Sequence, residues 1–154
     1  MTADRPSLTL VRRIKASPAK VYAAWTRPEQ MMRWWGPDGG PVLSAEADVR
    51  PGGRFRVVFR TMDGEEHDSR GVYREVEPGR RLVFTWQWVS TPERESLVTV
   101  ELRAIPEGTE LTFTHAQFHD EAVRDSHRWG WSGAFDKLER LFAQPAETIE
   151  DAST

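Results

Sequence analysis

The residues best able to do chemistry in this sequence are its four histidines, because the chain contains no cysteine. Nucleophilic catalysis by a thiol, thiolate metal sites and disulfide bonds are therefore excluded. His115 follows Leu111 and Phe113 at alternate positions of a strand-like run, a parity that turns its side chain toward the apolar side. There an imidazole can orient a ligand carbonyl or act as a general acid or base. Alternatively, His115 is a core histidine that bonds to a backbone carbonyl or to Tyr73.

A metal site is the second chemistry that the histidines suggest. The ionisable residues that lie close together along the chain are His115, His119, Asp120, Glu121 and His127. They span the end of a strand, a loop and a helix, and their spacing matches no recognised metal motif. We therefore expect no metal and no cofactor, and we expect His119 and Asp120 to be exposed where the helix begins.

Nucleotide chemistry has no support in the sequence. The run Asp38-Gly39-Gly40-Pro41 lacks the Lys and the Ser or Thr of a P-loop, and no nucleophile elbow or Ser-His-Asp order is present. The net charge is −3, so the basic patch expected of a nucleic-acid-binding protein is missing. We expect no nucleic-acid partner.

Length and composition indicate one globular domain. The chain has 154 residues, of which 38% are hydrophobic and 29% charged, and no apolar run is long enough to span a membrane. We expect a single domain over residues 1–144 and a disordered tail over 145–154, because the tail is polar and has little to bury. The first residues do not resemble a secretory signal, so the expected location is cytoplasmic.

Two short helices are predicted near the start of the chain. Ser17 is typical of a helix N-cap and Pro18 of a first helical position, and apolar residues then recur at helical spacing up to Trp25. Thr26 is the candidate cap of a second short helix, which carries two tryptophans and ends at Gly36. No basic recognition face follows the pair, so DNA binding is not indicated.

From residue 43 to residue 115 the apolar pattern changes to a period of two, which is typical of strands with one buried face. Asp63-Gly64 is a strong hairpin signal between two such runs. With one earlier run, seven strands are predicted, over residues 8–14, 43–49, 53–62, 66–76, 81–89, 96–104 and 109–115.

The last predicted element is a long helix that begins at Asp120 or Glu121 and ends near Gln144. Its wide apolar stripe must be buried, and a curved antiparallel sheet is the only partner large enough, so the fold class is α+β. Gly130 and Gly133 lie inside this helix, where each costs about 1 kcal/mol relative to Ala. They indicate a close backbone approach or space left for another molecule.

In this order, several runs resemble the family named for the activator of heat-shock protein 90 ATPase, a branch of the START-like, or SRPBCC, superfamily. The resemblance rests on VYAAWTRPEQMMRWWGP (21–37), VRPGGRFRV (49–57), GVYREVEPGRRLVFTW (71–86), GTELTFTH (108–115) and GWSGAFDKLERL (130–141). It implies a helix-grip fold, in which a curved sheet of six to seven strands wraps around the C-terminal helix. In this superfamily the space between them is a mostly apolar cavity for lipids, polyketides, hormones or other small molecules, and only some members catalyse a reaction.

Strand parity and the helix stripe together predict the lining of such a cavity. Most members are aromatic, as is typical of small-molecule pockets, although the same side chains would serve equally to fill a core. The candidate ligand-binding residues are Trp35, Phe55, Val57, Phe59, Tyr73, Phe84, Trp86, Trp88, Phe113, His115, Trp131 and Phe135. Arg54, Arg56 and Arg60 have the opposite parity, and we expect them on a solvated face opposite the acids of 65–68.

The function predicted first is a soluble protein that binds a hydrophobic or aromatic small molecule, with no assigned catalytic residue. The alternative is an enzyme of the cyclase or dehydratase type, in which His115 is the acid or base. The family name adds stimulation of a chaperone ATPase, which we do not expect because the chain lacks room for the second domain of the larger eukaryotic proteins. Exposed sheet edges or tryptophans suggest a homodimer.

Overall fold

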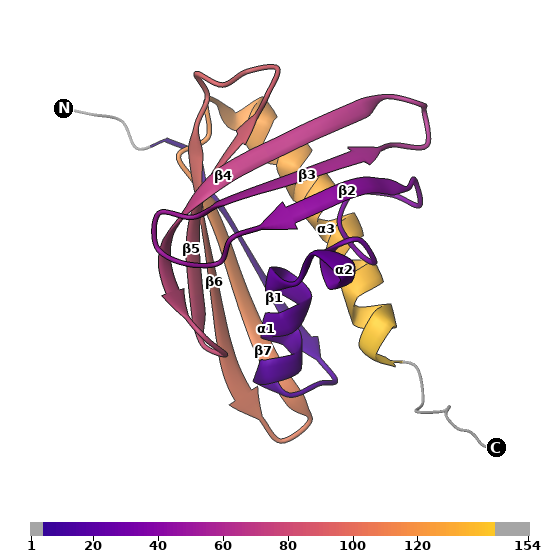
Figure 1. Cartoon of the computed structure of the whole chain (residues 1–154), viewed down its shortest axis with the longest axis vertical. Coiled ribbons are helices and arrows are strands. Elements are labelled where there is room, and N and C mark those ends of the chain that lie inside the picture. Colours follow the sequence, from indigo (N-terminus) through magenta and orange to yellow (C-terminus); the bar gives the residue numbers. More distant parts are fainter. Residues whose placement is uncertain (1–4, 144–154) are drawn as a thin grey trace.

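A curved antiparallel sheet of seven strands partly encloses one long helix in this computed structural model, which describes residues 5–143 (Figure 1). The spatial order of the strands is β1-β7-β6-β5-β4-β3-β2, so β1 and β2 form the two edges. The strands are β1 (Leu8–Ile14), β2 (Val42–Ala47), β3 (Arg54–Arg60), β4 (Glu66–Glu77), β5 (Arg81–Trp88), β6 (Ser96–Ile105) and β7 (Gly108–Ala116), and the helices are α1 (Pro18–Thr26), α2 (Pro28–Met31) and α3 (Glu121–Ala143).

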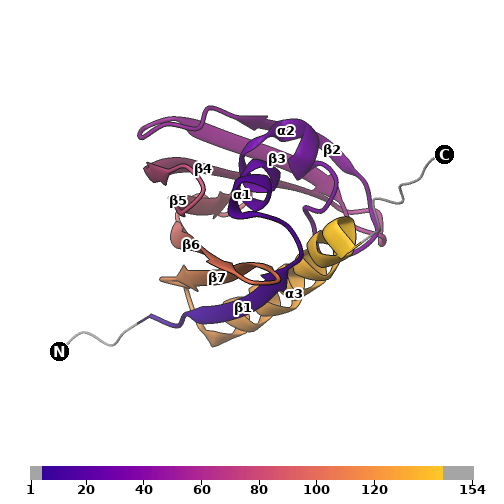
Figure 2. The same ribbon diagram turned by 90° about the horizontal axis from the view of Figure 1, so that it is seen from below.

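This arrangement is the helix-grip fold that the family resemblance implies. Seen from below, the sheet curves around α3, which runs beside β1, while α1 lies at the inner side of β6 and β7 (Figure 2). All seven predicted strands are confirmed, with bounds that differ by two residues or fewer. Within residues 5–143, no helix is long and apolar enough to cross a membrane.

The period-two pattern placed the inner face of the sheet correctly. Phe55, Val57 and Phe59 are buried on β3, and the hairpin at Asp63-Gly64 joins β3 to β4 with Arg60 paired to Glu66. The side chains of the other strands that were predicted to point inward are also buried or half-buried. A register shift between Tyr73 and Glu75 in the pairing of β4 with β5 does not change this parity near the pocket described below.

The first helix begins as predicted, but the second does not. The Ser17 hydroxyl accepts a hydrogen bond from the backbone N–H of Lys20, so Ser17 is the N-cap of α1. The predicted Thr26 cap is wrong, since the Thr26 hydroxyl donates to the carbonyl of Tyr22 inside α1. Arg27 is the residue that separates the helices, because a residue before proline is held in an extended conformation.

The second helix is also shorter than predicted. It ends at Met31, and the chain continues through turns that carry Trp34 and Trp35 into the core. Both indoles are buried although they occupy adjacent positions outside a regular helix. The Trp34 Nε1–H donates to the carbonyl of Ala24 at 2.9 Å and so fixes this segment on α1.

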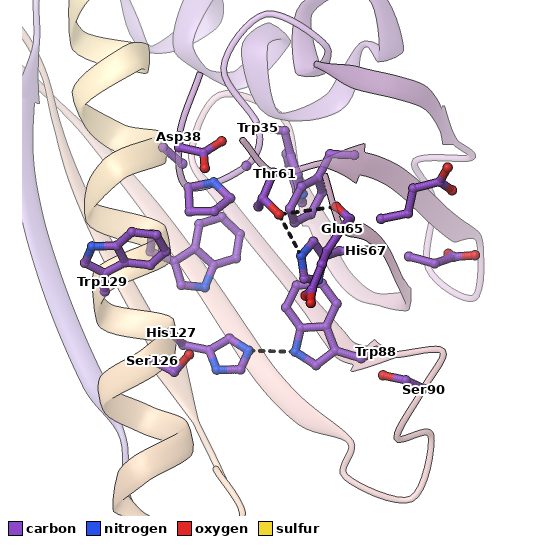
Figure 3. A pocket seen from close by; sticks show the side chains of 18 of the residues that line it. Trp35, Asp38, Thr61, Glu65, His67, Trp88, Ser90, Ser126, His127 and Trp129 are labelled. Atoms are coloured by element: carbon purple, nitrogen blue, oxygen red, sulfur yellow. Dashed lines mark hydrogen bonds between the residues drawn. The ribbon is translucent and has the colours of Figure 1, made fainter. Parts of the chain in front are cut away.

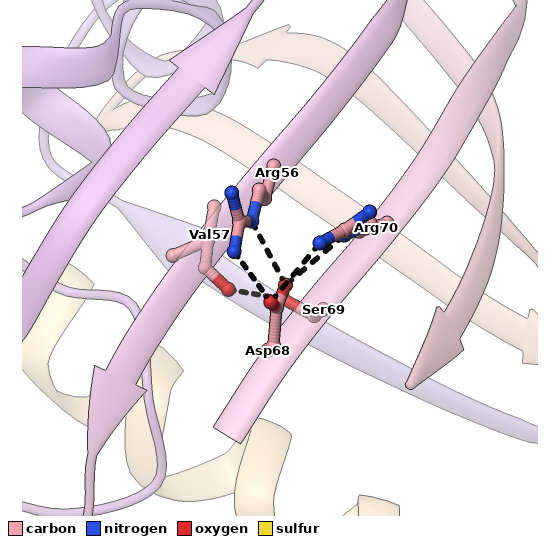
Figure 4. Close-up of polar contacts among 5 residues, drawn as sticks. All are labelled: Arg56, Val57, Asp68, Ser69 and Arg70. Carbon is pink, nitrogen blue, oxygen red and sulfur yellow. Dashed lines mark hydrogen bonds and ion pairs between the residues drawn. The ribbon is translucent and has the colours of Figure 1, made fainter. Parts of the chain in front are cut away.

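The predicted solvated face of the first hairpin is confirmed. Arg54, Arg56 and Arg60 are exposed on the outer side of β3. The carboxylate of Asp68 on β4 accepts hydrogen bonds from the guanidinium groups of Arg56 and Arg70, at 2.8–3.3 Å (Figure 4). These exposed ion pairs are consistent with a charged face turned to water, and they fix the local charge beside the mouth of the pocket.

The segment that follows Trp35 is held against α3 by a glycine and a lysine. A Cβ atom on Gly133 would overlap the carbonyl oxygen of Pro37, so the predicted close backbone approach is confirmed at this glycine. Lys137, one turn further along, donates from Nζ to the carbonyl oxygens of Trp35 at 3.0 Å and Asp38 at 2.6 Å. Burial lowers the pKa of Lys137, and these carbonyls provide its polar contacts.

Gly130 differs from Gly133 although the two lie on the same helix. A Cβ at Gly130 would touch only the Pro37 side chain, at an ordinary 3.7 Å. We therefore expect Gly130→Ala to raise the free energy of unfolding by roughly 0.5–1 kcal/mol through helix propensity. Gly133→Ala is expected to lower it by about 1–3 kcal/mol, because the clash with backbone forces α3 away from the loop.

Urea unfolding of the two variants and the parent protein measures both effects. The pair is internally controlled, since the same methyl group is added to the same helix three residues apart. Stability changes of the same sign in both variants would contradict the packing described here.

Candidate functional site

One open pocket of about 670 Å³ lies between α3 and the strands β3, β4 and β5 (Figure 3). Its inner wall is aromatic, and its mouth is formed by the β3–β4 turn, the segment 36–38 and the residues that follow β5. The lining side chains that carry an aromatic ring are Trp35, Phe59, His67, Trp86, Trp88, His127, Trp129 and Trp131. The size and apolar wall are those of a small-molecule site.

Trp86 is the centre of this wall. Its ring centroid lies 5.1 Å from that of Trp131 on α3, 5.3 Å from that of Trp88 and 5.9 Å from that of Trp35. The three neighbours come from α3, the same strand and the segment after α2, so the wall forms only when sheet, helix and loop meet. Tilted and offset pairs of this kind each contribute about 0.5–1.5 kcal/mol beyond burial.

Five of the twelve candidate ligand-binding residues line the pocket, and seven do not. The five are Trp35, Phe59, Trp86, Trp88 and Trp131. The other seven, Phe55, Val57, Tyr73, Phe84, Phe113, His115 and Phe135, are buried in the packed core. Their inward direction is as predicted, but the space in front of them is occupied.

Trp25 of α1 occupies the space in front of Phe84, Phe113 and Phe135. Its ring centroid lies 6.0 Å from those of Phe113 and Phe135, and 6.3 Å from that of Phe84. Trp34 packs against it at 4.8 Å. The sheet and α3 therefore enclose a filled core at the α1 end and an open pocket at the other end.

His115 is bonded within the core and does not face the pocket. The Trp131 Nε1–H donates to Nδ1 of His115 at 3.1 Å, so Nδ1 carries no proton. The proton of the neutral imidazole is on Nε2, which donates to the Ser96 hydroxyl at 2.7 Å. Burial, with a smaller effect of His127, lowers the pKa of His115 well below its usual value. The expected partners, a backbone carbonyl or Tyr73, were wrong. Val98 on β6 pairs with His115, and Ser96, two residues before Val98, therefore lies on the same face and reaches the ring.

His127 joins α3 to the sheet at the side of the pocket. Its Nδ1–H donates to the carbonyl of Val123 at 2.9 Å, and its Nε2 accepts from the Trp88 Nε1–H at 3.1 Å (Figure 3). Burial lowers the pKa of His127, which agrees with a neutral ring that accepts from an indole. A smaller pocket of about 380 Å³ adjoins this bridge and shares Trp86, Trp88, Ser90, Ser126 and His127 with the first.

His67 was not among the residues selected from the sequence. It lies opposite Phe59 in the β3–β4 ladder and stacks on that ring with a centroid distance of 5.1 Å. Its Nε2 is 3.2 Å from the Thr61 hydroxyl, which itself donates to Asp63 at 2.5 Å. The signal that would have found it is parity, because His67 and Ser69 alternate on the inner face of β4.

The mouth of the pocket carries carboxylates and hydroxyls. Asp38 accepts from the backbone N–H groups of Gly40 at 2.9 Å and Met62 at 3.0 Å, so its charge is used to hold the loop against β3. None of the lining residues is a lysine or an arginine. In residues 5–143 no group of three His, Asp or Glu side chains is placed to hold a metal ion, and His119 and Asp120 are exposed as expected.

Comparison with protein families matches residues 15–143 to the family described as activator of Hsp90 ATPase homolog 1-like protein. A solved structure from Rhizobium leguminosarum is 29% identical, with a TM-score of 0.75 over 90% of this chain and 94% of that one. The AHSA1 protein of Silicibacter pomeroyi is 25% identical, with a TM-score of 0.78 over 90% and 98%. The AHSA1-like protein of Aeromonas hydrophila, at 22% identity and a TM-score of 0.78 over 97% and 99%, shares the fold. Comparison with curated protein sequences gave no match.

The two buried neutral histidines predict how stability depends on pH. In the folded protein the pKa values of His115 and His127 lie below the ordinary 6.5, so below that pH the unfolded chain binds protons that the folded chain does not. The free energy of unfolding is therefore expected to fall as the pH is lowered from about 7 to about 5. The slope is at most about 1.4 kcal/mol per pH unit for each histidine.

Urea unfolding at about pH 7, 6 and 5 measures this slope. His127→Gln keeps an acceptor for Trp88 but removes one titrating ring, so it should flatten the curve. His119→Gln makes the same change at an exposed position and should leave the slope unaltered. A slope that changes equally in both variants would contradict the assignment.

Proposed function

This chain belongs to the family of activator of Hsp90 ATPase homolog 1-like proteins, within the START-like superfamily, and we propose that it binds an apolar, aromatic small molecule in the pocket between β3–β5 and α3. The observation that carries the proposal is the combination of a filled core and an unfilled aromatic pocket in one interior. Rings of the same kind close the space at the Trp25 end and leave about 670 Å³ open at the Trp86 end. Aromatic surface is ordinarily buried, so an open pocket of this size lined by indoles is typical of a small-molecule binding site.

The wall is also held in place before any ligand arrives. Trp131 and Trp88 are each fixed through their indole N–H, to His115 and His127 respectively. Trp35 is fixed through its carbonyl by Lys137. A rigid wall favours binding because little side-chain freedom remains to be lost when the ligand enters.

The geometry favours binding over catalysis by His115. Both nitrogens of His115 are engaged, by Ser96 and by Trp131, and the side chain is fully buried. A general acid or base must lie within hydrogen-bond reach of the reacting proton. His115 would first have to release one of these core partners, which makes it a structural residue in this proposal.

Native mass spectrometry of the purified protein, followed by organic extraction, tests the proposal. We expect a discrete small molecule that is lost in Gly130→Leu, because Gly130 lines the pocket and a Cβ atom there meets only the Pro37 side chain, at 3.7 Å. Arg128→Leu is the matched control, since it introduces the same side chain on the same helix at an exposed position outside the lining.

Two results would overturn the proposal. One is a co-purified molecule that remains equally bound in Gly130→Leu, which would place it elsewhere. The other is a protein that is free of small molecules and also fails to bind the naphthalene probes used below.

A further inference from the structure

The inner wall of the pocket offers a ligand almost no polar contact. The indole N–H groups of Trp88 and Trp131 already donate to His127 and His115. The Nε1 of Trp86 has no partner within residues 5–143, but this atom is itself buried, so a molecule in the pocket does not reach it. The Nε1–H of Trp35 makes no hydrogen bond within residues 5–143 and is not a buried atom, so polar recognition of a ligand is left to this donor and to the groups at the mouth.

His67 presents a free hydrogen-bond acceptor at that mouth. The Thr61 hydroxyl has a single proton and lies against two groups that can only accept, the Asp63 carboxylate and the Glu65 carbonyl oxygen. Toward His67 the hydroxyl oxygen must consequently be the acceptor, and Nε2 of His67 must carry the hydrogen. In the neutral imidazole the lone pair is then on Nδ1.

That nitrogen is accessible as well as unpartnered. In the part of the chain that the structure describes, Nδ1 of His67 makes no hydrogen bond and is not among the buried unpaired atoms. The ring is held by stacking on Phe59 and by its tilted contact with Trp88, whose centroid is 5.8 Å away (Figure 3). An acceptor is thus fixed beside the aromatic wall.

The charges around the mouth of the pocket also favour a ligand that is not an anion. Glu65 lines the pocket and its exposed carboxylate has no ion-pair partner within residues 5–143, and no lysine or arginine is among the lining residues. The arginines that contact lining carboxylates are already in ion pairs, Arg56 and Arg70 with Asp68 and Arg60 with Glu66. Lys137 is not among the lining residues and donates to the carbonyl oxygens of Trp35 and Asp38, so a negatively charged ligand group would meet more carboxylates than cations here.

We propose that the ligand is an apolar aromatic molecule with one hydrogen-bond donor at its outer end, such as a phenolic hydroxyl or an aryl amine, and that Nδ1 of His67 accepts this bond. The inference rests on the proposed function, because it assigns a ligand class to the same pocket. The rings of the ligand would lie against Trp86 and Trp131, and an anionic aromatic acid would be rejected.

Three probes with one ring system separate these features. They are 2-naphthol, which has a donor, 2-methoxynaphthalene, which has only an acceptor, and 2-naphthoate, which is an anion. Isothermal titration calorimetry at about pH 8, where histidine is neutral, is expected to give 2-naphthol the tightest binding. The expected preference over 2-methoxynaphthalene is roughly 3- to 10-fold, the effect of one net hydrogen bond. 2-Naphthoate should bind more weakly than both.

Two substitutions assign the preference to His67. His67→Phe keeps a ring on Phe59 but removes both nitrogens, so it should bind 2-naphthol and 2-methoxynaphthalene equally well. His67→Asn places an amide oxygen near the position of Nδ1 and should restore part of the preference. Unchanged binding of 2-methoxynaphthalene shows in each case that the pocket is still folded.

The outcomes distinguish this inference from the proposed function. If the probes bind and Gly130→Leu abolishes binding, but 2-naphthoate binds as tightly as 2-naphthol, the ligand class is wrong and the pocket stands. A preference for 2-naphthol that survives in His67→Phe equally overturns the role of His67. If no probe binds to the parent protein, both proposals fail.

Discussion

The packing of the Trp25 indole between sheet and helix is the contact on which the rest of this structure depends. The Trp25 side chain comes from α1, yet its ring centroid lies about 6 Å from those of rings on β5, β7 and α3. An indole is the largest side chain available, and its burial removes roughly 150–250 Å² of surface from water. The indole fills one end of the enclosed space, while the other end, at Trp86, stays open.

Hydrogen bonds to two histidines hold the tryptophans of the pocket wall in place. His115 and His127 each accept a hydrogen bond from an indole of the pocket wall, and each donates its own N–H to an oxygen, on Ser96 and Val123 respectively. A buried polar group without a partner costs about 1–3 kcal/mol, so these bonds strongly favour one orientation of each ring. Burial lowers both pKa values because it disfavours the charged ring, and the neutral imidazoles that result can accept from the indoles and so fix the aromatic wall.

The loop after Trp35 shows how one small residue positions several large ones. Because Gly133 has no side chain, the carbonyl of Pro37 approaches α3 directly, and Lys137 then reaches the carbonyls of Trp35 and Asp38. Asp38 in turn accepts from Gly40 and Met62, which ties the loop to the β3–β4 turn. The boundary of the pocket is therefore continuous from α3 to the turn that carries Thr61 and His67.

The sequence by itself determined which face of each element is apolar and in what order the elements follow. Alternation along β3 and β7, the Asp63-Gly64 turn, the Ser17 cap and the stripe around Trp131 are local patterns, and each depends only on neighbours along the chain. The same is true of the inward direction of all twelve candidate binding residues. Five of them line the pocket, while whether any of them contacts a ligand stays a prediction.

Only the tertiary structure decided which inward residues face a filled core and which face open space. That division depends on where the ring of Trp25 comes to rest, and its partners Phe84, Phe113 and Phe135 lie far from it in sequence. The partners of His115 were missed for the same reason, whereas the position of His67 could have been found from the parity of β4. Periodicity reports the direction of a side chain, whereas volume and hydrogen-bond pairing are set by contacts between distant segments.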